Sequence, residues 1–155
     1  KGIANGFNVA ALCGKDFLKP TGSSITYPGS YWMSAVPFAA AIACINKMKA
    51  RGGGQAHLAL GRKVCDVLAK AARENGVGLS ISGEPSLFYL RITDDNSLML
   101  HQEWIAEMVK RGVYVTNHHN HFTNLSLTDA DIDFTGQVAD EAFKALKARH
   151  PELYQ

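Results

Sequence analysis

The sequence predicts an α/β protein, and three observations carry that prediction. Apolar residues make up 46% of the 155 residues and charged residues 19%, so the chain can bury a core. Helical periodicity covers two long stretches in the middle of the chain, and shorter helices alternate with apolar runs after them. Residues 79–82 and 87–92 have the pattern of two strands joined by a Gly-Glu-Pro turn. We therefore expect a small, mainly antiparallel sheet with helices on one side, over about residues 55–155.

The two long helices are expected at residues 35–51 and 55–74. Ser34 can cap the start of the first helix, and Gly52 can adopt the left-handed conformation after its end. Small residues, mainly alanine, form one face of this helix, which allows close approach to a sheet. The second helix carries one apolar stripe and ends at Asn75-Gly76.

Two further helices complete this part of the chain. One is expected over residues 97–110, closed by Gly112. The last begins at Thr128, where Asp131 occupies the third helical position of a capping-box-like start. Further strand candidates are residues 113–115 and 122–127. The core is expected where helix 55–74, Phe88, Leu90, Trp104 and Met108 meet.

The first third of the chain has a different character. Residues 1–34 are rich in glycine and show no convincing amphipathic helix. Residues 9–13 form a short apolar run that predicts a buried strand, and loop-forming residues follow it. An isolated domain seldom opens with one strand and a long loop, and no initiator Met is present. We expect the chain to be part of a longer protein, with residues 1–34 packed mainly on protein outside it.

Charge and cysteine content argue against several classes of partner and location. Sixteen Lys and Arg residues stand against fourteen Asp and Glu residues, a net charge of +2, which argues against a nucleic-acid partner. No apolar run is long enough to predict a membrane-spanning helix. The three cysteines are Cys13, Cys44 and Cys65, without a Cys-x-x-Cys pair. Reduced thiols in a cytoplasmic protein are therefore expected.

The cluster Asn-His-His-Asn-His at residues 117–121 is the first candidate for chemistry. Zinc sites usually gather ligands from two well-separated places, and no carboxylate or cysteine shows a matching spacing. We favour a polar loop over a metal site, and expect at most one of these histidines to face the active-site cleft.

Other motifs are weaker. A cysteine nucleophile needs an adjacent base and a depressed pKa, and neither is indicated for any of the three cysteines. The sequence has no Gly-x-Ser-x-Gly elbow, and Gly52-Gly53-Gly54 lacks the lysine and hydroxyl of a phosphate-binding loop, so it is interpreted as a connector. The aromatic residues Tyr31 and Trp32 can stack on a ring or bury an interface.

Three short motifs stand in a fixed order along the chain. The first is Lys-Gly-Ile-Ala-Asn-Gly at residues 1–6, and the second is Gly-Ser-Tyr-Trp at residues 29–32, before the alanine-rich helix. The third is Arg-Gly-Val at residues 111–113 with Thr-Asp-Ala-Asp-Ile-Asp at residues 128–133. Together they resemble class III aminotransferases, nearest to the branch of glutamate-1-semialdehyde aminomutase and its relatives. The resemblance spans nearly the whole chain.

The resemblance implies the C-terminal part of a fold type I pyridoxal-phosphate-dependent transferase, beginning at the cofactor lysine. Residues 1–54 would be the end of the large cofactor-binding domain, and residues 55–155 the C-terminal small domain. It also implies an upstream segment of the same enzyme and a homodimer with a shared active site. The implied activity is amino-group transfer through a lysine Schiff base, as an aminotransferase or a 2,1-aminomutase, on a small amino or oxo substrate.

The same resemblance assigns roles to individual residues. Lys1 would form the internal aldimine with pyridoxal 5'-phosphate and then act as general acid and base. Gly29 and Ser30 would bind the cofactor, because Ser30 occupies the place of a threonine that reaches the phosphate of the neighbouring subunit's cofactor. Tyr31 and Trp32 would line the substrate cleft.

The sequence also departs from the family pattern. Many amino-acid-specific members carry an arginine before the last helix that clamps a substrate carboxylate, and residues 121–126 contain none. Use of an α-carboxylated acceptor by that route is therefore in doubt. Two other classes stay open: a non-catalytic α/β interaction or regulatory domain that has lost the cofactor, and a small metal-binding protein that uses the histidine cluster.

Overall fold

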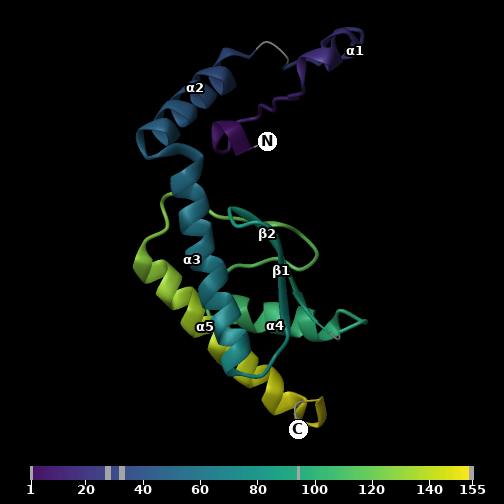
Figure 1. Cartoon of the computed structure of the whole chain (residues 1–155), viewed down its shortest axis with the longest axis vertical. Coiled ribbons are helices and arrows are strands. Elements are labelled where there is room, and N and C mark those ends of the chain that lie inside the picture. Colours follow the sequence, from purple (N-terminus) through teal and green to yellow (C-terminus); the bar gives the residue numbers. More distant parts are fainter. Residues whose placement is uncertain (1, 27–28, 32–33, 94, 154–155) are drawn as a thin grey trace. The chain divides into compact units, whose positions relative to one another are not determined.

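The computed structural model describes residues 2–26, 29–31, 34–93 and 95–153, and its backbone is shown in Figure 1. The chain divides into two compact units, Lys1–Gly53 and Gly54–Gln155.

The first unit is helical and open. Its elements are η1 (Gly2–Ala4), η2 (Asp16–Leu18), α1 (Lys19–Ser23) and α2 (Ala35–Ala50). Helix α2 contacts η1, and Ala4 and Ala41 are the buried residues among those described in this unit. Large apolar side chains such as Leu12, Phe17 and Tyr31 are 74–89% exposed. This unit therefore has very little core of its own.

The strand predicted at residues 9–13 is not present. The structure describes these residues as irregular and mostly exposed, and no described strand lies beside them. The reason is physical: a strand is stabilised by backbone hydrogen bonds to a neighbouring strand, and an apolar run alone cannot supply them. The helix predicted at 35–51 is confirmed as α2, and Gly52 after it has a φ of 89°. Ser34 occupies the N-cap position, but its side chain makes no capping hydrogen bond.

The second unit is the α/β part. Its elements are α3 (Gly53–Glu74, starting at the boundary), β1 (Leu79–Glu84), β2 (Leu87–Ile92), α4 (Met99–Lys110), β3 (His121–Phe122), α5 (Asp129–Arg149) and η3 (Pro151–Leu153). The three strands form one antiparallel sheet in the order β1-β2-β3. The predicted α/β class and antiparallel sheet are confirmed.

One face of the sheet joins the helices in a single core. Ile81 pairs with Leu90, and Leu79 with Ile92, so their side chains share a face. Leu90 and Ile92 are buried with residues of α3, α4 and α5. The intervening Ser80, Ser82 and Arg91 are exposed on the opposite face. At the centre, the ring of Trp104 on α4 stacks on that of Phe143 on α5, with centroids 4.8 Å apart.

Two glycines allow close approaches of α3. A Cβ atom on Gly61 would lie 2.2 Å from the carbonyl oxygen of Pro85, in the β1–β2 turn. A Cβ on Gly136 of α5 would lie 3.0 Å from the Cβ of Val67, which is where α5 meets α3 (Figure 1). The hairpin and α5 therefore each approach α3 closely at a glycine.

The predicted helix ends of this unit are confirmed. Thr128 and Asp131 form a reciprocal capping box at the start of α5. Gly76 follows α3 with a φ of 66°, and Gly112 follows α4 with a φ of 95°. Glycine adopts these positive φ values readily because it has no Cβ.

Two strand predictions need correction. Residues 113–115 are not a strand, because the N–H of Val113 donates to the carbonyl of Met108 and so belongs to the closure of α4. The strand predicted at 122–127 is limited to His121–Phe122. The strand stops because Asn124 starts a turn. The side chain of Asn124 accepts a hydrogen bond from the N–H of Ser126, and its backbone carbonyl accepts one from the N–H of Leu127.

None of the helices in the described part of the chain combines the length and the apolar composition that a membrane crossing requires.

Candidate functional site

The predicted site residues all belong to the first unit. Lys1 and Trp32 lie outside the described residues. Gly29, Ser30 and Tyr31 are described, and all three are exposed. Tyr31 is 89% exposed, so the described part of the chain leaves this aromatic side chain uncovered.

A hollow of about 300 Å³ brings two of the predicted segments together. Gly6, Phe7 and Asn8 line it from the segment that follows Lys1, and Tyr31 lines it from the segment 29–32. The remaining lining residues are Ser34, Val36 and Pro37, at the start of α2. These two segments are far apart in the sequence, so the hollow is a product of the fold of this unit.

Local turns hold both sides of this hollow. On one side, the N–H of Asn5 donates to the carbonyl of Gly2, and Gly6 follows with a φ of 105°. That conformation is one that a residue with a Cβ rarely adopts. On the other side, the N–H of Ser34 donates to the carbonyl of Tyr31, 3.2 Å away, directly before α2 begins. The lining offers a phenol, a hydroxyl, an amide and an aromatic ring, and no charged side chain among the described residues.

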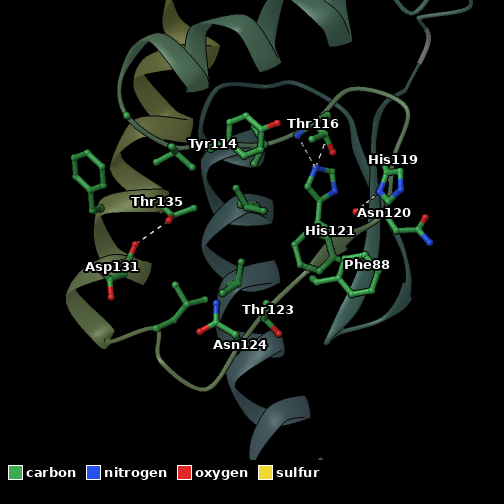
Figure 2. A pocket seen from close by; sticks show the side chains of 18 residues that line it. Phe88, Tyr114, Thr116, His119, Asn120, His121, Thr123, Asn124, Asp131 and Thr135 are labelled. Carbon is green, nitrogen blue, oxygen red and sulfur yellow. Dashed lines mark hydrogen bonds between the residues drawn. The ribbon is translucent and has the colours of Figure 1, made fainter. Parts of the chain in front are cut away.

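A larger hollow of about 580 Å³ lies within the second unit (Figure 2). Helices α3 and α5 and the segment 112–124 form its walls, and Phe88 of β2 lies at one side. His119, His121 and Thr123 also line it, whereas His118 does not. Two of the three clustered histidines therefore line one hollow, and the sequence did not predict this hollow.

Hydrogen bonds and stacking hold the histidines in place. His121 Nε2 lies 3.2 Å from the carbonyl oxygen of Thr116, and its ring stacks on Phe88 with centroids 5.4 Å apart. Burial lowers the pKa of His121, opposed by hydrogen bonds to the backbone of Thr116 and Phe88. His119 Nδ1 lies 2.9 Å from the carbonyl oxygen of Asn120.

No three His, Cys, Asp or Glu side chains among the described residues come together in a way that could hold a metal ion.

The comparisons with known proteins give one consistent result. No family model matches the sequence. The chain is 30% identical over 146 residues to the aminopentol aminotransferase of Sphingopyxis macrogoltabida, covering 94% of this chain and 35% of that protein. It is 23% identical over 151 residues to the 3-aminobutyryl-CoA aminotransferase of Cloacimonas acidaminovorans (strain Evry), covering 95% of this chain and 36% of that protein. These relatives are aminotransferases.

A solved structure extends the likeness to the fold. The structure of the PLP internal aldimine form of the FumI protein from Sphingopyxis sp. MTA144 matches with a TM-score of 0.83 and 29% identity. The match covers 99% of this chain and 37% of that one. The chain therefore has the fold of part of a pyridoxal-phosphate enzyme, and it spans about a third of the length of the proteins it matches.

The described residues of the first hollow fit the ring of such a cofactor. Phe7 and Tyr31 offer aromatic faces, and Asn8 and Ser34 offer hydrogen-bonding groups beside them. The Ser30 hydroxyl, next to Tyr31, is exposed and is of a type that binds phosphate oxygens. The described lining includes no Lys or Arg, so it does not supply a cation for the phosphate.

Phe7, Asn8 and Thr123 were not predicted as site residues. Phe7 and Asn8 stand in the sequence as ordinary loop residues, and only their position opposite Tyr31 distinguishes them. The sequence signal that could have found them is their closeness to Lys1. No comparable signal marks Thr123.

Proposed function

We propose that this chain is part of a longer pyridoxal-phosphate-dependent enzyme that transfers amino groups, and that Lys1 binds the cofactor. The observation that carries the proposal is the match to the FumI structure, with a TM-score of 0.83 over 99% of the chain. The 30% identity to an aminopentol aminotransferase over 94% of the chain supports the same class of reaction.

The proposed roles follow the resemblance of the sequence motifs to class III aminotransferases. Bound pyridoxal phosphate supplies an electron-accepting ring. Lys1 Nζ holds it covalently and, when a substrate amine takes its place, carries a proton away from the substrate carbon and returns it. The Ser30 hydroxyl donates a hydrogen bond to the phosphate. Tyr31 and Trp32 line the space in which the substrate is oriented.

We assign residues 1–54 to the end of the large cofactor-binding domain and residues 55–155 to the small domain. The exposure of Leu12, Phe17 and Tyr31 supports this assignment, because such side chains are normally covered by protein. An upstream segment and a second subunit are the proposed covering partners. In the resulting homodimer, Gly29 and Ser30 of one subunit face the cofactor of the other.

Transfer to a second molecule is the preferred reaction, and the aminomutase reaction is the second candidate. The two named relatives are both aminotransferases. The absence of arginine from residues 121–126 favours substrates without an α-carboxylate. The aminomutase reaction rests on the resemblance of the sequence motifs alone.

One experiment separates the candidates. The enzyme that contains this chain is loaded with pyridoxal phosphate and given ¹⁵N-labelled hexylamine with butanal, an acceptor that has no α-carboxylate. We expect labelled butylamine as the product. Label that moves to the neighbouring carbon of a single substrate would favour the aminomutase. An enzyme that retains no cofactor after gel filtration would favour the non-catalytic interaction domain.

The cysteines support a cytoplasmic location as a further proposal. Cys13, Cys44 and Cys65 are free, and Cys13 is exposed. Exposed free thiols persist in reducing compartments. Microscopy of the tagged protein in its own cells tests this location.

A further inference from the structure

Segment 112–124, which joins α4 to β3 and the start of the turn after it, is anchored by backbone hydrogen bonds near both of its ends. At the first anchor, the N–H of Val113 donates to a carbonyl in the last turn of α4 at 3.1 Å. At the second, the N–H of Thr123 donates to the carbonyl of Ser86 at 3.2 Å, and its carbonyl oxygen lies 2.7 Å from Nε2 of His57. Both anchors survive acid, because a protonated His57 still donates to a carbonyl.

Side-chain contacts hold the middle of the segment, residues 116–121. His121 Nε2 lies 3.3 Å from the backbone nitrogen of Thr116 and 3.2 Å from its carbonyl oxygen, and its ring stacks on Phe88 (Figure 2). The nitrogen accepts from the N–H when the ring is neutral and can donate to the carbonyl when it is protonated. His121 therefore keeps a partner in either charge state.

Two further features make this middle part easy to release. His118 has a φ of 55°, a left-handed conformation that residues with a Cβ seldom adopt. Nδ2 of Asn117 donates to Oε1 of Gln102 on α4 at 3.2 Å, but this bond is exposed and competes with water. The closed position of the middle part is thus stabilised only weakly by these residues.

His101 of α4 is the buried histidine next to Gln102. It is 2% exposed, its Nδ1 has no hydrogen-bond partner among the described residues, and its ring centroid lies 5.9 Å from that of Trp104. A proton on Nδ1 would place a positive charge in the core without water or an acceptor at that atom. Burying such a charge is unfavourable, so the closed structure requires the neutral ring.

The charges around His101 show where a proton on it would act. Burial has the largest effect on the pKa of His101 and lowers it, whereas the carboxylate of Asp95 raises it. His118 and His121 of the segment, together with Arg91 of β2, lower the pKa further by repulsion. Two of the three repelling groups therefore belong to the middle of the segment.

We propose that segment 112–124 is an acid-released strap. Neutral His101 allows residues 116–121 to lie closed, and protonation of His101 releases them while both anchors hold. Because this part lines the larger hollow together with α3 and α5, its release changes the shape of that hollow. The device lies within the second unit and requires neither Lys1 nor the cofactor, so it goes beyond the proposed function and is tested separately from it.

The test is hydrogen–deuterium exchange with mass spectrometry on the enzyme that contains this chain, at pH 7.5 and pH 5.5, corrected for the intrinsic pH dependence of amide exchange. Exchange follows the population of the open state. If that state takes up the proton with the ordinary pKa of 6.5 and the closed state excludes it, the open population rises about tenfold between the two pH values. We expect that increase in peptides that cover residues 116–121, and no change in α3 or α5.

Three variants locate the responsible proton. His101→Gln and His101→Phe carry no titratable group at this position, so each should lose the acid response of the strap. His119→Gln is the matched control, because His119 is an exposed histidine of the same strap. It should keep the acid response within about twofold.

The unchanged protein provides a measurement that does not depend on how a variant folds. Slow deuterium exchange at the C2 position of each imidazole, followed by mass spectrometry, reports the pKa of individual histidines. We expect the midpoint for His101 to lie below 6.5 and to coincide with the midpoint of strap opening.

Four results would overturn the proposal. The first is exchange at residues 116–121 that does not depend on pH, and the second is an acid response that persists in every folded His101 variant. The third is a His101 that is still neutral at the pH where the strap opens. The fourth is acid-induced exchange throughout the second unit, which would show that the whole unit unfolds and the strap is not released by itself.

Discussion

Trp104 is the residue on which the core of the second unit most depends. Its side chain is fully buried and stacks on Phe143 with an interplanar angle of 13°. Trp104→Ala removes this stacking and leaves a large cavity, so we expect the free energy of unfolding to fall by about 3–5 kcal/mol. Urea denaturation of the 155-residue chain measures it. Tyr114→Ala is the matched control, because Tyr114 is 82% exposed and its loss should change stability by less than about 0.5 kcal/mol. Equal losses for the two variants would contradict the packing described.

At the scale of single residues, the candidate site could be predicted only in part. The motifs identified the segments around Lys1 and Tyr31, and the structure brings Gly6, Phe7 and Asn8 opposite Tyr31 in one hollow. Thr123 could not be predicted. Its position depends on hydrogen bonds to residues more than thirty and sixty positions away in the sequence, Ser86 and His57.

At the scale of elements, the contact of α3 with the β1–β2 turn rests on Gly61. Alanine normally stabilises a helix relative to glycine by about 0.5–1 kcal/mol. Gly61→Ala should instead destabilise the chain by about 1–3 kcal/mol, because the new Cβ would lie 2.2 Å from the Pro85 carbonyl oxygen. Gly54→Ala in the same helix meets nothing within 4 Å and should be neutral or stabilising. Thermal unfolding of both variants checks the difference, and a stabilising Gly61→Ala would show that the approach is not this close.

The helices were predictable because their signals are local. The capping box of Thr128 and Asp131 defines the start of α5 within one turn of the backbone. Gly112 likewise ends α4 through its own backbone conformation. The strands were less predictable because a strand needs a partner elsewhere. The run at residues 9–13 is as apolar as a strand, yet no described strand bonds to it, and Val113 bonds to the end of α4 instead.

For the second unit as a whole, a buried carboxylate joins two helices. Glu107 of α4 is 4% exposed. It pairs with Lys110 on the same helix, with Arg111 directly after that helix, and with Arg149 of α5. The side-chain bonds from Arg111, then from Lys110 and Arg149, lower the pKa of Glu107 from 4.5 to about 2. Because the folded state lowers this pKa, the stabilisation is complete above pH 4.5 and is lost as the pH falls toward about 2.

We therefore expect the free energy of unfolding to decline between pH 4.5 and about pH 2, as measured by urea titrations across that range. Glu107→Gln should lower stability at pH 7 and make the decline shallower, since one of the contributing carboxylates is gone. Lys70, which forms an exposed pair with Glu74, provides the control: Lys70→Gln should leave the pH dependence unchanged. A Glu107→Gln variant with an unchanged slope would contradict the role of this carboxylate.

The most direct measurement for the whole molecule identifies the residue that holds the cofactor. The enzyme that contains this chain is loaded with pyridoxal phosphate, treated with sodium borohydride to fix the cofactor to its amine, digested and mapped by mass spectrometry. We predict the label on Lys1, and its disappearance in Lys1→Ala and in Lys1→Arg, since a guanidinium remains protonated and cannot take the place of the amine. Label on Lys15, Lys19 or any other lysine would contradict the assignment of Lys1 and, with it, the proposed function.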